Sequence, residues 1–376
     1  MPPAEIFISA GEASGDMYAA QLARALQQRA DVHLFGMGGP RMREAGVETL
    51  VDFSQVHVAG IFEVLHKLPE LRRAMRTLRA ESARRHPSIA RLTDFPGFHL
   101  RLARTLKGRG VRNVYFVCPQ FWAWRPWRVN LVRRRFERGL CLFPFEVDFY
   151  RKAGVAVDWI GHPLIDHVRT SLPRPEFLVR HGLDPARPII AILPGSRPSE
   201  LSHHMPRLMQ SVALLGKSPE RQFILVVAPG LSRDQFDPYI PPQSPVHVIE
   251  DAAYDALAAA DVSIVSSGTA TVEAALLGAP MVVIYRVSKA TAWIAKRLMR
   301  APYIAMVNLI AQKRAVPELI QDAFEPQEVA REVERLLSSP AARATMKEDL
   351  AEVSRRLGPP GAISRAADII ASMIKQ

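Results

Sequence analysis

The chain has 376 residues, of which 48% are hydrophobic and 23% charged, and its 49 Lys and Arg against 37 Asp and Glu give a formal net charge of +12. This length suggests about two domains of ~100–200 residues, and the composition excludes a mostly disordered chain. The only two cysteines, Cys118 and Cys141, exclude a disulfide scaffold and indicate a reducing compartment.

Short β-branched or apolar runs alternate with amphipathic helical stretches along most of the chain, which favours parallel sheets covered on both faces. We therefore predict an α/β protein with two Rossmann-like, doubly wound domains joined near residues 161–172, followed by a helical C-terminal segment. The expected strands are Ile6–Ser9, Val32–Phe35, Val111–Val117, Arg138–Phe143, Ala156–Ile160, Ile189–Leu193, Phe223–Val227, Val246–Ile249, Val262–Val265 and Met281–Ile284. The expected helices are Met17–Ala30, Leu100–Arg109, Ala252–Ala259, Thr271–Leu277, Gln327–Leu337, Ala341–Leu357 and Ile363–Ile374.

Loops that follow strands carry most of the candidate chemistry, because ligands of open α/β sheets bind beyond the carboxyl ends of the strands. In Ile6–Asp16, Gly11 and Gly15 allow close approach of the backbone, and the helix that follows can hold an anion at its start. A tight turn without any ligand explains this segment equally well, since it matches neither a Walker loop nor a dinucleotide fingerprint.

Two loops of the second half have the same strand, turn and helix order. In Ile192–Glu200, a glycine and a serine expose backbone donors and Arg197 can form a forked contact with a phosphate. In Val265–Glu273, the turn at Gly268 leads into a helix start whose hydroxyls and N–H groups suit a diphosphate. The carboxylate of Glu273 can accept both hydroxyls of a ribose. Plain helix caps are the alternative for both loops.

Three further segments remain ambiguous on their residues alone. Asp94 follows an expected strand, where a general base would stand, but a turn-forming Asx residue explains it as well. The loop Cys118–Trp127, with three Trp and one Arg, can line a sugar or nucleotide site, stack on RNA bases or anchor itself. His162 can face a cleft or satisfy a buried hydrogen bond. No Cys/His cluster has zinc spacing, so we expect no metal site.

The charge is uneven along the chain. Residues 1–165 hold 25 Lys and Arg against 15 Asp and Glu, whereas residues 166–376 hold 24 against 22. Such a field attracts nucleic acid, nucleotides or an anionic membrane, although solvated arginine-rich helix faces also explain it. A dense apolar stretch, Val56–Leu71, precedes six arginines, which suits either interfacial membrane binding or a core helix. We expect neither a signal peptide nor a membrane span.

Taken in order, these segments resemble the lipid-A-disaccharide synthase family of inverting GT-B glycosyltransferases. The resemblance runs from Ile6 to about Phe324. The matching segments are Ala10–Asp16, Gly36–Met42, Trp122–Pro126, Leu142–Glu146, Gly161–Pro163, Leu193–Arg197, Ser267–Thr271, Tyr285–Ser288, Asn308–Leu309 and Val316–Leu319. Any one of them can arise by chance, but their common order is specific.

The resemblance implies a hexosyltransferase that joins UDP-2,3-diacylglucosamine to 2,3-diacylglucosamine 1-phosphate (lipid X), giving a β(1→6) disaccharide 1-phosphate and UDP without a cofactor. Because an acceptor hydroxyl is a poor nucleophile, a carboxylate must take its proton, and Asp94 matches the family's proposed base. Fixed donors stabilise the leaving UDP. The implied substrate-binding residues are Glu12, Ser14, Gly15, His162, Gly195, Ser196, Arg197, Ser267, Gly268, Thr269, Glu273 and Asn308.

The implied layout is an acceptor- and membrane-facing domain at 1–165, a UDP-binding domain at 166–340, and C-terminal helices at 341–376 that pack back on the first domain or on a partner chain. The resemblance also implies a swapped homodimer, a cytoplasmic location and peripheral attachment to the inner face of the bacterial inner membrane, with no nucleic-acid partner.

One segment departs from the family pattern. The family reads Asp-x-Pro-Asp-Phe-Asn where this chain has Asp94-Phe-Pro-Gly97-Phe-His99, and Arg91 stands in the preceding strand where an apolar residue is expected. His99 can replace the missing polar group, or activity can be reduced. The alternatives are therefore another UDP-sugar enzyme such as a 2-epimerase, a non-catalytic membrane- or nucleotide-binding relative, and, with least support, a nucleic-acid-binding protein.

Overall fold

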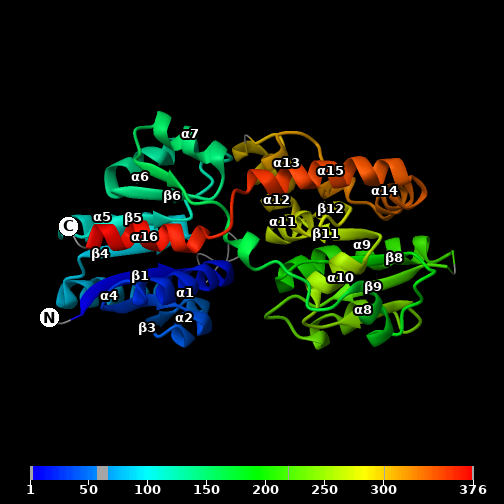
Figure 1. Ribbon diagram of the computed structural model, residues 1–376, viewed down its shortest axis with the longest axis horizontal. Helices are drawn as coiled ribbons and strands as arrows, with labels where there is room; N and C mark the ends of the chain where they lie inside the picture. The colour runs from blue at the N-terminus through cyan, green and yellow to red at the C-terminus, as the bar shows by residue number, and fades with distance from the viewer. Residues whose placement is uncertain (1–2, 57–66, 219, 300, 375–376) are drawn as a thin grey trace. The chain divides into compact units, whose positions relative to one another are not determined.

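The structure is a computed structural model that describes residues 3–56, 67–218, 220–299 and 301–374. The described chain divides into two compact units (Figure 1). The first unit comprises residues 1–166 and 357–376, and the second comprises residues 167–356. Most of the apolar stretch Val56–Leu71, for which the sequence leaves a membrane-binding segment and a core helix open, lies outside the described residues.

The first unit contains a seven-stranded parallel sheet with the order β3-β2-β1-β4-β5-β6-β7. Its strands are β1 (Ala4–Ala10), β2 (Val32–Gly38), β3 (Glu48–Asp52), β4 (Ile89–Thr93), β5 (Arg112–Phe116), β6 (Arg138–Cys141) and β7 (Val157–Trp159). Its helices are α1 (Ala13–Gln27), α2 (Pro40–Glu44), α4 (Leu68–Arg85), α5 (Pro96–Lys107), α6 (Val129–Arg135), α7 (Pro144–Lys152) and α16 (Ala362–Ile374).

Both faces of this sheet are buried because alternate residues of each strand point to opposite sides. On one face, Phe7, Phe35 and Leu92 pack with apolar residues of α4 and α5. On the other face, Ile6 and Ile8 pack with alanines of α1. The apolar runs of the sequence therefore form strands that are covered on both sides, as the alternation of strands and helices predicts.

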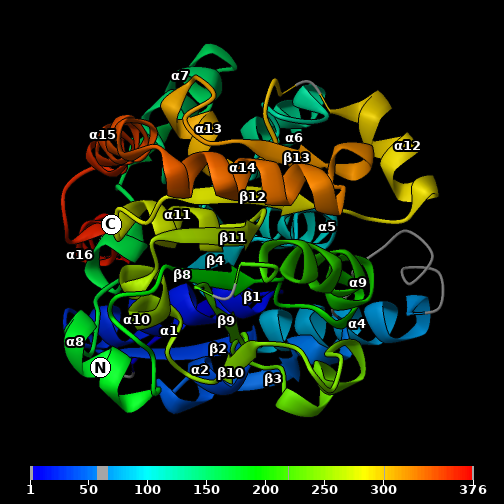
Figure 2. The ribbon, with the colours of Figure 1, turned by 90° about the vertical axis from the view of Figure 1, so that its right-hand side faces the viewer.

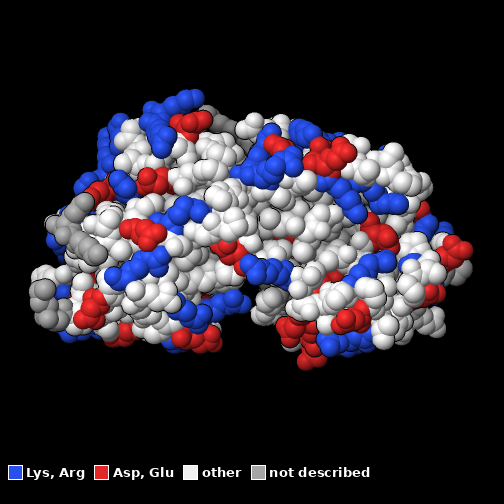
Figure 3. Space-filling view, in the orientation of Figure 1, with Lys and Arg blue, Asp and Glu red and all other residues white. Residues whose placement is uncertain are grey.

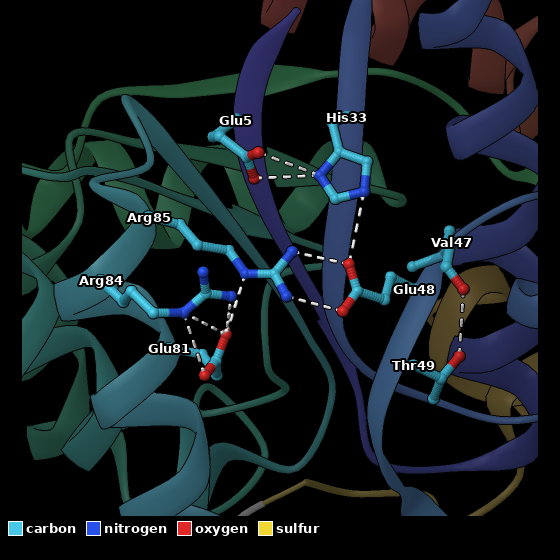
Figure 4. A network of polar contacts seen from close by, with 8 residues as sticks. All are labelled: Glu5, His33, Val47, Glu48, Thr49, Glu81, Arg84 and Arg85. Atoms are coloured by element: carbon cyan, nitrogen blue, oxygen red, sulfur yellow. Dashed lines mark hydrogen bonds and ion pairs between the residues drawn. The ribbon is translucent and has the colours of Figure 1, made fainter.

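A network of charged side chains joins α4 to the amino-terminal edge of this sheet (Figure 4). Arg85 of α4 contacts Glu48 of β3 through two nitrogens at 2.6 Å each, and Glu81 at 2.9 Å. His33 of β2 lies 3.1 Å from Glu5 of β1 and 3.4 Å from Glu48. The hydrogen bond from Arg85 lowers the pKa of Glu48 below its usual value. The network fixes the edge opposite to the one where ligands of such sheets bind.

The second unit contains a six-stranded parallel sheet with the order β10-β9-β8-β11-β12-β13. In Figure 2 the labels of this sheet follow that order from β10 at the bottom to β13 at the top. Its strands are β8 (Ile189–Leu193), β9 (Gln222–Val226), β10 (Val246–Ile249), β11 (Val262–Ser266), β12 (Met281–Tyr285) and β13 (Glu318–Ile320). Its helices are α8 (Arg174–Arg180), α9 (Pro198–Leu215), α10 (Ala253–Ala259), α11 (Thr269–Leu276), α12 (Lys289–Leu298), α13 (Met306–Ala311), α14 (Pro326–Ser338) and α15 (Pro340–Arg356).

The last two helices lie in different units. α15 packs on α11 and α13 within the second unit, whereas α16 packs on α1 within the first. Arg29 at the end of α1 donates to Asp368 at 2.7 Å and to Ser364 at 2.6 Å, both on α16. Arg365 of α16 donates to the carbonyl oxygen of Ile160. The chain changes from one unit to the other between Arg356 and Leu357, at the start of the segment that joins α15 to α16.

In each sheet the strand order reverses at one place, between β1 and β4 in the first unit and between β8 and β11 in the second. Ligands of doubly wound sheets bind beyond the carboxyl ends of the strands at such a reversal. The four loops at these two places are the Gly-rich turn after β1, the Asp94 segment after β4, and the loops at 194–197 and 267–268. These are the same loops that the sequence selects for chemistry. Two outer strands, β3 and β13, are not among the strands predicted from the sequence.

Candidate active site

Asp94 lies directly after β4, and hydrogen bonds hold it on three sides. Its Oδ1 atom accepts from the backbone N–H of Gly11 at 2.7 Å. Its carbonyl oxygen accepts from the hydroxyl of Tyr115 at 2.9 Å and from Nδ1 of His99 at 2.9 Å. Asp94 and Phe95 both have positive φ angles, of 53° and 39°. Such strained backbone persists only where its surroundings fix it, and it often marks functional sites.

The second carboxylate oxygen of Asp94 points toward the start of α1. A Cβ atom added at Gly15 would lie 1.6 Å from Oδ2, so Gly15 leaves the room that this carboxylate occupies. Within the described residues Oδ2 is buried and accepts no hydrogen bond. Burial raises the pKa of Asp94 well above its usual value, and the charge of Glu12 raises it further. The N–H groups of Gly11 and Glu12 and the charge of Arg91 act in the opposite direction.

His99 is fully buried and takes a bridging position beneath Asp94. Because a carbonyl oxygen only accepts, Nδ1 carries the hydrogen that is donated to Asp94, and Nε2 accepts from the hydroxyl of Ser9 at 2.8 Å. Burial lowers the pKa of His99 to about 4, so the ring is neutral at pH 7. Gly97 is exposed in the first turn of α5, and a Cβ atom there would meet no atom of the described residues within 4 Å. His99 thus supplies a polar contact inside the site, whereas Gly97 supplies none.

The polar residues of the turn between β1 and α1 have two different roles. Asp16 accepts from the N–H groups of Gly39, Arg41 and Met42, so it caps α2 and does not face Asp94. Glu12 occupies the cap position of α1, and its charge acts on Asp94. Ser14 is exposed in the first turn of α1. The first unit therefore brings Glu12, Gly15 and Asp94 together.

His162 is a buried residue of the first unit and does not titrate near neutral pH. Its Nδ1 atom accepts from the N–H of Leu164 at 3.2 Å, and burial lowers its pKa to about 3. Its ring lies 6.3 Å from the ring of Tyr18 and 5.4 Å from that of Phe143. Of the two sequence interpretations, the structure shows the satisfied buried hydrogen bond.

The loop after β8 forms a compact turn around a carboxylate. Glu200 of α9 accepts from the backbone N–H of Ser196 at 2.9 Å, and its other oxygen lies 3.7 Å from Arg197. Gly195 has a φ of 135°, and a Cβ atom there would lie 2.4 Å from Glu200. The carboxylate thus holds the arginine and the N–H donors of this loop in place. An arginine next to a helix start suits the oxygens of a phosphate.

The loop after β11 leads into α11 and presents hydroxyl groups at its start. Ser267 donates to the carbonyl oxygen of Ile304 at 3.3 Å, and Thr271 donates to that of Gly268 at 2.8 Å. Thr269 begins the helix. Glu273, one turn further, accepts from the hydroxyl of Tyr254 at 3.2 Å, and burial raises its pKa. Because β8 and β11 are neighbours, residues 195–197 and 267–269 follow adjacent strands at the same edge of the sheet.

Asn308 belongs to the interior of the second unit. It is fully buried, and its amide donates to the carbonyl oxygen of Val316 and to Glu318 and accepts from the N–H of Val316, at 2.8–2.9 Å. Glu318 in turn accepts from the N–H groups of Ile304 and Ala305. Sequence reasoning selects Asn308 but gives no role to Glu318, although Glu318 lies in the matching segment Val316–Leu319. It also misses Tyr254, which lies in no motif.

The aromatic loop after β5 is partly buried and partly exposed. Trp122 donates to Glu146 at 3.1 Å, and burial raises the pKa of that carboxyl to about 7. Trp124 and Trp127 are 37% and 61% exposed. Arg125 and Arg128 lie 5.2 Å and 5.6 Å from the ring centres of these two tryptophans, respectively. The loop therefore has one side that anchors it and another that faces outward.

The two doubly wound units define the chain as an α/β protein of the GT-B class, as predicted. Two solved structures resemble it over the full length. They are a UDP co-structure of MnaA from S. aureus (TM-score 0.66, 11% identity, 99% of this chain and 97% of that chain) and the glycotransferase of kitacinnamycin (TM-score 0.65, 18% identity, 99% of this chain and 100% of that chain). At these identities the likeness concerns the fold alone.

The sequence comparisons identify the family. The family model described as lipid-A-disaccharide synthetase matches residues 6–370. The chain is 43% identical over 372 residues to the lipid-A-disaccharide synthase of Geobacter sulfurreducens, covering 98% of this chain and 97% of that protein. The chain therefore belongs to the lipid-A-disaccharide synthase family, which confirms the resemblance seen in the sequence. It is an enzyme, a glycosyltransferase of lipid A biosynthesis.

Proposed function

We propose that the enzyme transfers a diacylglucosaminyl group from UDP-2,3-diacylglucosamine to 2,3-diacylglucosamine 1-phosphate, with inversion, giving a β(1→6) disaccharide 1-phosphate and UDP. The observation that carries this proposal is the state of Asp94. One carboxylate oxygen is held by the N–H of Gly11 at 2.7 Å, and the other accepts no hydrogen bond from the described residues. A carboxylate fixed in this way retains lone pairs for a proton from an acceptor hydroxyl.

The reaction then needs one proton transfer and one displacement. The 6-hydroxyl oxygen of the acceptor forms a bond to the anomeric carbon of the donor while its proton passes to Asp94. The bond from that carbon to the UDP oxygen breaks, and its electron pair leaves with the β-phosphate. Attack opposite to the leaving group inverts the anomeric configuration.

Negative charge that develops on UDP requires donors that are already in place. The second unit offers Arg197 and the helix start at Gly268 and Thr269, whereas the N–H of Ser196 already donates to Glu200. Glu273, which is held by Tyr254, is the proposed acceptor for the ribose hydroxyls. We assign Glu12, Ser14 and Gly15 to the acceptor side. His162 and Asn308, which are buried and hydrogen-bonded internally, act by holding the neighbouring loops in place.

Replacing Asp94 by Asn tests the assignment of the base. The amide keeps the shape of the side chain but cannot take the proton, so we expect kcat to fall by about 10²–10⁴-fold with little change in KM for the donor. Disaccharide formation from the two lipid substrates in mixed micelles is the readout. Asp148→Asn, an exposed carboxylate on α7, serves as the matched control. Near-normal turnover by Asp94→Asn would contradict the assignment, and UDP binding without product in the unaltered enzyme would contradict the function.

We further propose that the first unit binds an anionic membrane surface through α5, α6 and the aromatic loop. Between Asp94 and Glu137 the chain has ten Lys and Arg and no Asp or Glu. α5 packs on α6, and most of these cations are exposed. Figure 3 shows Lys and Arg side chains gathered in the upper left, where Figure 1 places α6 and α7. Exposed tryptophans beside arginines suit the headgroup region of a bilayer.

Co-flotation with vesicles tests this surface. We expect the unaltered protein to bind phosphatidylglycerol vesicles but not vesicles of neutral lipid. The double variant Trp124→Ser, Trp127→Ser should lose affinity for the phosphatidylglycerol vesicles. Trp293→Ser is the matched control, because Trp293 is also 61% exposed and also carries an arginine on its ring, but lies in the second unit. Equal loss in the control would place the membrane contact elsewhere. Among the described residues no helix is long and apolar enough to cross a membrane.

The proposed swapped homodimer uses a contact that exists within the chain. α16 packs on α1 through the pairs Arg29–Asp368 and Arg29–Ser364. Exchange of α16 between two chains would preserve these bonds between protomers. Because the same contact exists in the closed chain and in the exchanged dimer, a disulfide between Arg29→Cys and Asp368→Cys tests the proposal. A covalent dimer on a non-reducing gel supports the exchange, and cross-linked single chains alone contradict it.

A further inference from the structure

Arg91 is a fully buried arginine in the middle of β4. It pairs with Ile8 of β1 and Val114 of β5, so its side chain lies on the face of the sheet that α1 covers. Arginine is among the residues least often buried in this way, because removing its charge from water costs several kcal/mol unless the charge is compensated. A buried cation at this position therefore requires an explanation.

Few groups compensate this charge. One guanidinium nitrogen, Nη2, donates to the hydroxyl of Thr93 at 3.2 Å, and the guanidinium carbon lies 4.3 Å from the ring centre of Phe116. The other two nitrogens, Nε and Nη1, have no hydrogen-bond partner within the part of the chain that the structure describes. Both contacts lie toward the carboxyl end of β4, because Thr93 follows Arg91 and Phe116 pairs with Thr93. The side chain thus extends toward Asp94.

Asp94 complements this cation. Its carboxylate points to the same face, because Oδ2 occupies the space next to Gly15 of α1. Oδ2 is buried without a hydrogen bond, as are Nε and Nη1 of Arg91. The charge of Asp94 raises the pKa of Arg91, and the charge of Arg91 lowers the pKa of Asp94. A cation and an anion thus share one buried face of the sheet, and within the described residues each lacks full hydrogen bonding.

We propose that Arg91 is a positioning residue whose buried charge favours the ionised form of the Asp94 carboxylate, which is the form that the base role requires. This inference rests on the base role assigned to Asp94 above. Arg91 itself does not touch substrate, since it is fully buried. Its effect is electrostatic, and it acts against the burial and the Glu12 charge, which favour the protonated carboxyl.

The other groups around Asp94 do not provide this compensation. Glu12, from the turn after β1, is an anion and acts in the wrong direction. Tyr115 of β5 donates only to the carbonyl oxygen, and burial raises its pKa further above neutrality. His99 of α5 is neutral above pH 5, since its pKa is about 4. From α1, Gly15 adjoins the carboxylate and brings no side chain.

The test replaces Arg91 by Met, which keeps an unbranched, flexible side chain and removes the charge, and compares the pH dependence of kcat/KM with that of the unaltered enzyme. Loss of an opposite charge raises a carboxyl pKa by about 1–3 units, so the acidic limb of the profile moves to higher pH by at least about one unit. Activity lost at pH 7 then returns on raising the pH, whereas KM for the donor changes little. Arg138→Met is the control. It removes an arginine of β6 that pairs with Asp158 of β7, and the acidic limb of its pH profile should stay where it is in the unaltered enzyme.

A second measurement does not depend on turnover. In protein labelled with ¹³C at the Asp carboxyl carbons, the Asp94 resonance is assigned by its absence from Asp94→Asn, and its titration midpoint is followed in both proteins. A higher titration midpoint of Asp94 in Arg91→Met supports the proposal. If Asp94→Asn proves active, that result overturns the base role of Asp94 but not the effect of Arg91 on its ionisation. An unchanged midpoint, or equal activity loss at every pH, overturns the proposal. Arg91→Gln gives the same neutral comparison should Arg91→Met fail to fold.

Discussion

A single methyl group at Gly15 tests whether the structure places the Asp94 carboxylate correctly. The Cβ atom of Gly15→Ala would lie 1.6 Å from Oδ2 and 2.8 Å from Cγ of Asp94, distances that real contacts do not reach. The carboxylate must therefore move by an ångström or more, which breaks its bond to Gly11. Displacing a catalytic group by about 1 Å costs about 10²-fold in rate, so we expect kcat to fall by about this factor.

The stability effect of Gly15→Ala is the balance of two terms. Overpacking a full site costs about 1–3 kcal/mol, and Ala in place of Gly in a helix returns up to about 1 kcal/mol. A net loss of about 0–2 kcal/mol is expected, which leaves a folded enzyme in which kcat can be measured. Product formation and urea unfolding are the assays.

Gly97→Ala supplies the matched control for this substitution. Gly97 also lies in the first turn of a helix, but a Cβ atom there meets no atom of the described residues within 4 Å. We expect unchanged kcat and a small gain in stability from the lower chain entropy of the unfolded state. If Gly15→Ala turned over as fast as Gly97→Ala, the carboxylate would not stand where the structure has it, and the reasoning on the base would fail.

Two further predictions concern other residues. Glu273→Gln removes the charged acceptor that Tyr254 holds, so KM for the UDP-sugar should rise by about tenfold or more, with a smaller change in kcat; steady-state kinetics with an unchanged KM would contradict the ribose contact. His162→Gln concerns stability, because the folded pKa of His162 is about 3, below the unfolded value of 6.5, so the unfolded chain binds the extra proton. As the pH is lowered from 6.5 to 3, the free energy of unfolding therefore falls by about 1.4 kcal/mol per pH unit because of this residue. The urea midpoint should depend less steeply on pH in the variant.

The sequence predicts the parts of the site that depend on chain order. Each candidate loop directly follows an apolar strand, and parallel strands bring such loops to one edge. Gly15 and Gly195 are selected as places where the backbone approaches a ligand. The structure gives each a second reason, since Gly15 leaves room for Asp94 and Gly195 for Glu200. Neither carboxylate can be assigned to its glycine from the sequence, because the contact with Asp94 joins residues 79 positions apart.

Interior polar contacts are harder to predict because they depend on side-chain packing between distant segments. The resemblance implies that Asn308 binds substrate, yet its side-chain amide makes hydrogen bonds to Val316 and Glu318. The sequence allows His162 either to face a cleft or to make a buried hydrogen bond. The structure shows that it is buried and accepts from Leu164. Periodicity gives the face of a strand but not which polar group will be satisfied there.

The three departures from the family pattern around Asp94 differ in what they bring to the carboxylate. Gly97, which stands where the family pattern has an aspartate, is exposed in the first turn of α5 and brings no charge. His99 stands in place of an asparagine and stays neutral, donating to the carbonyl oxygen of Asp94 without adding charge. Arg91 adds a buried cation on the face to which the carboxylate points. An opposite charge favours the ionised carboxylate, so of the three departures Arg91 is the one that favours the form of Asp94 required by the proposed base role.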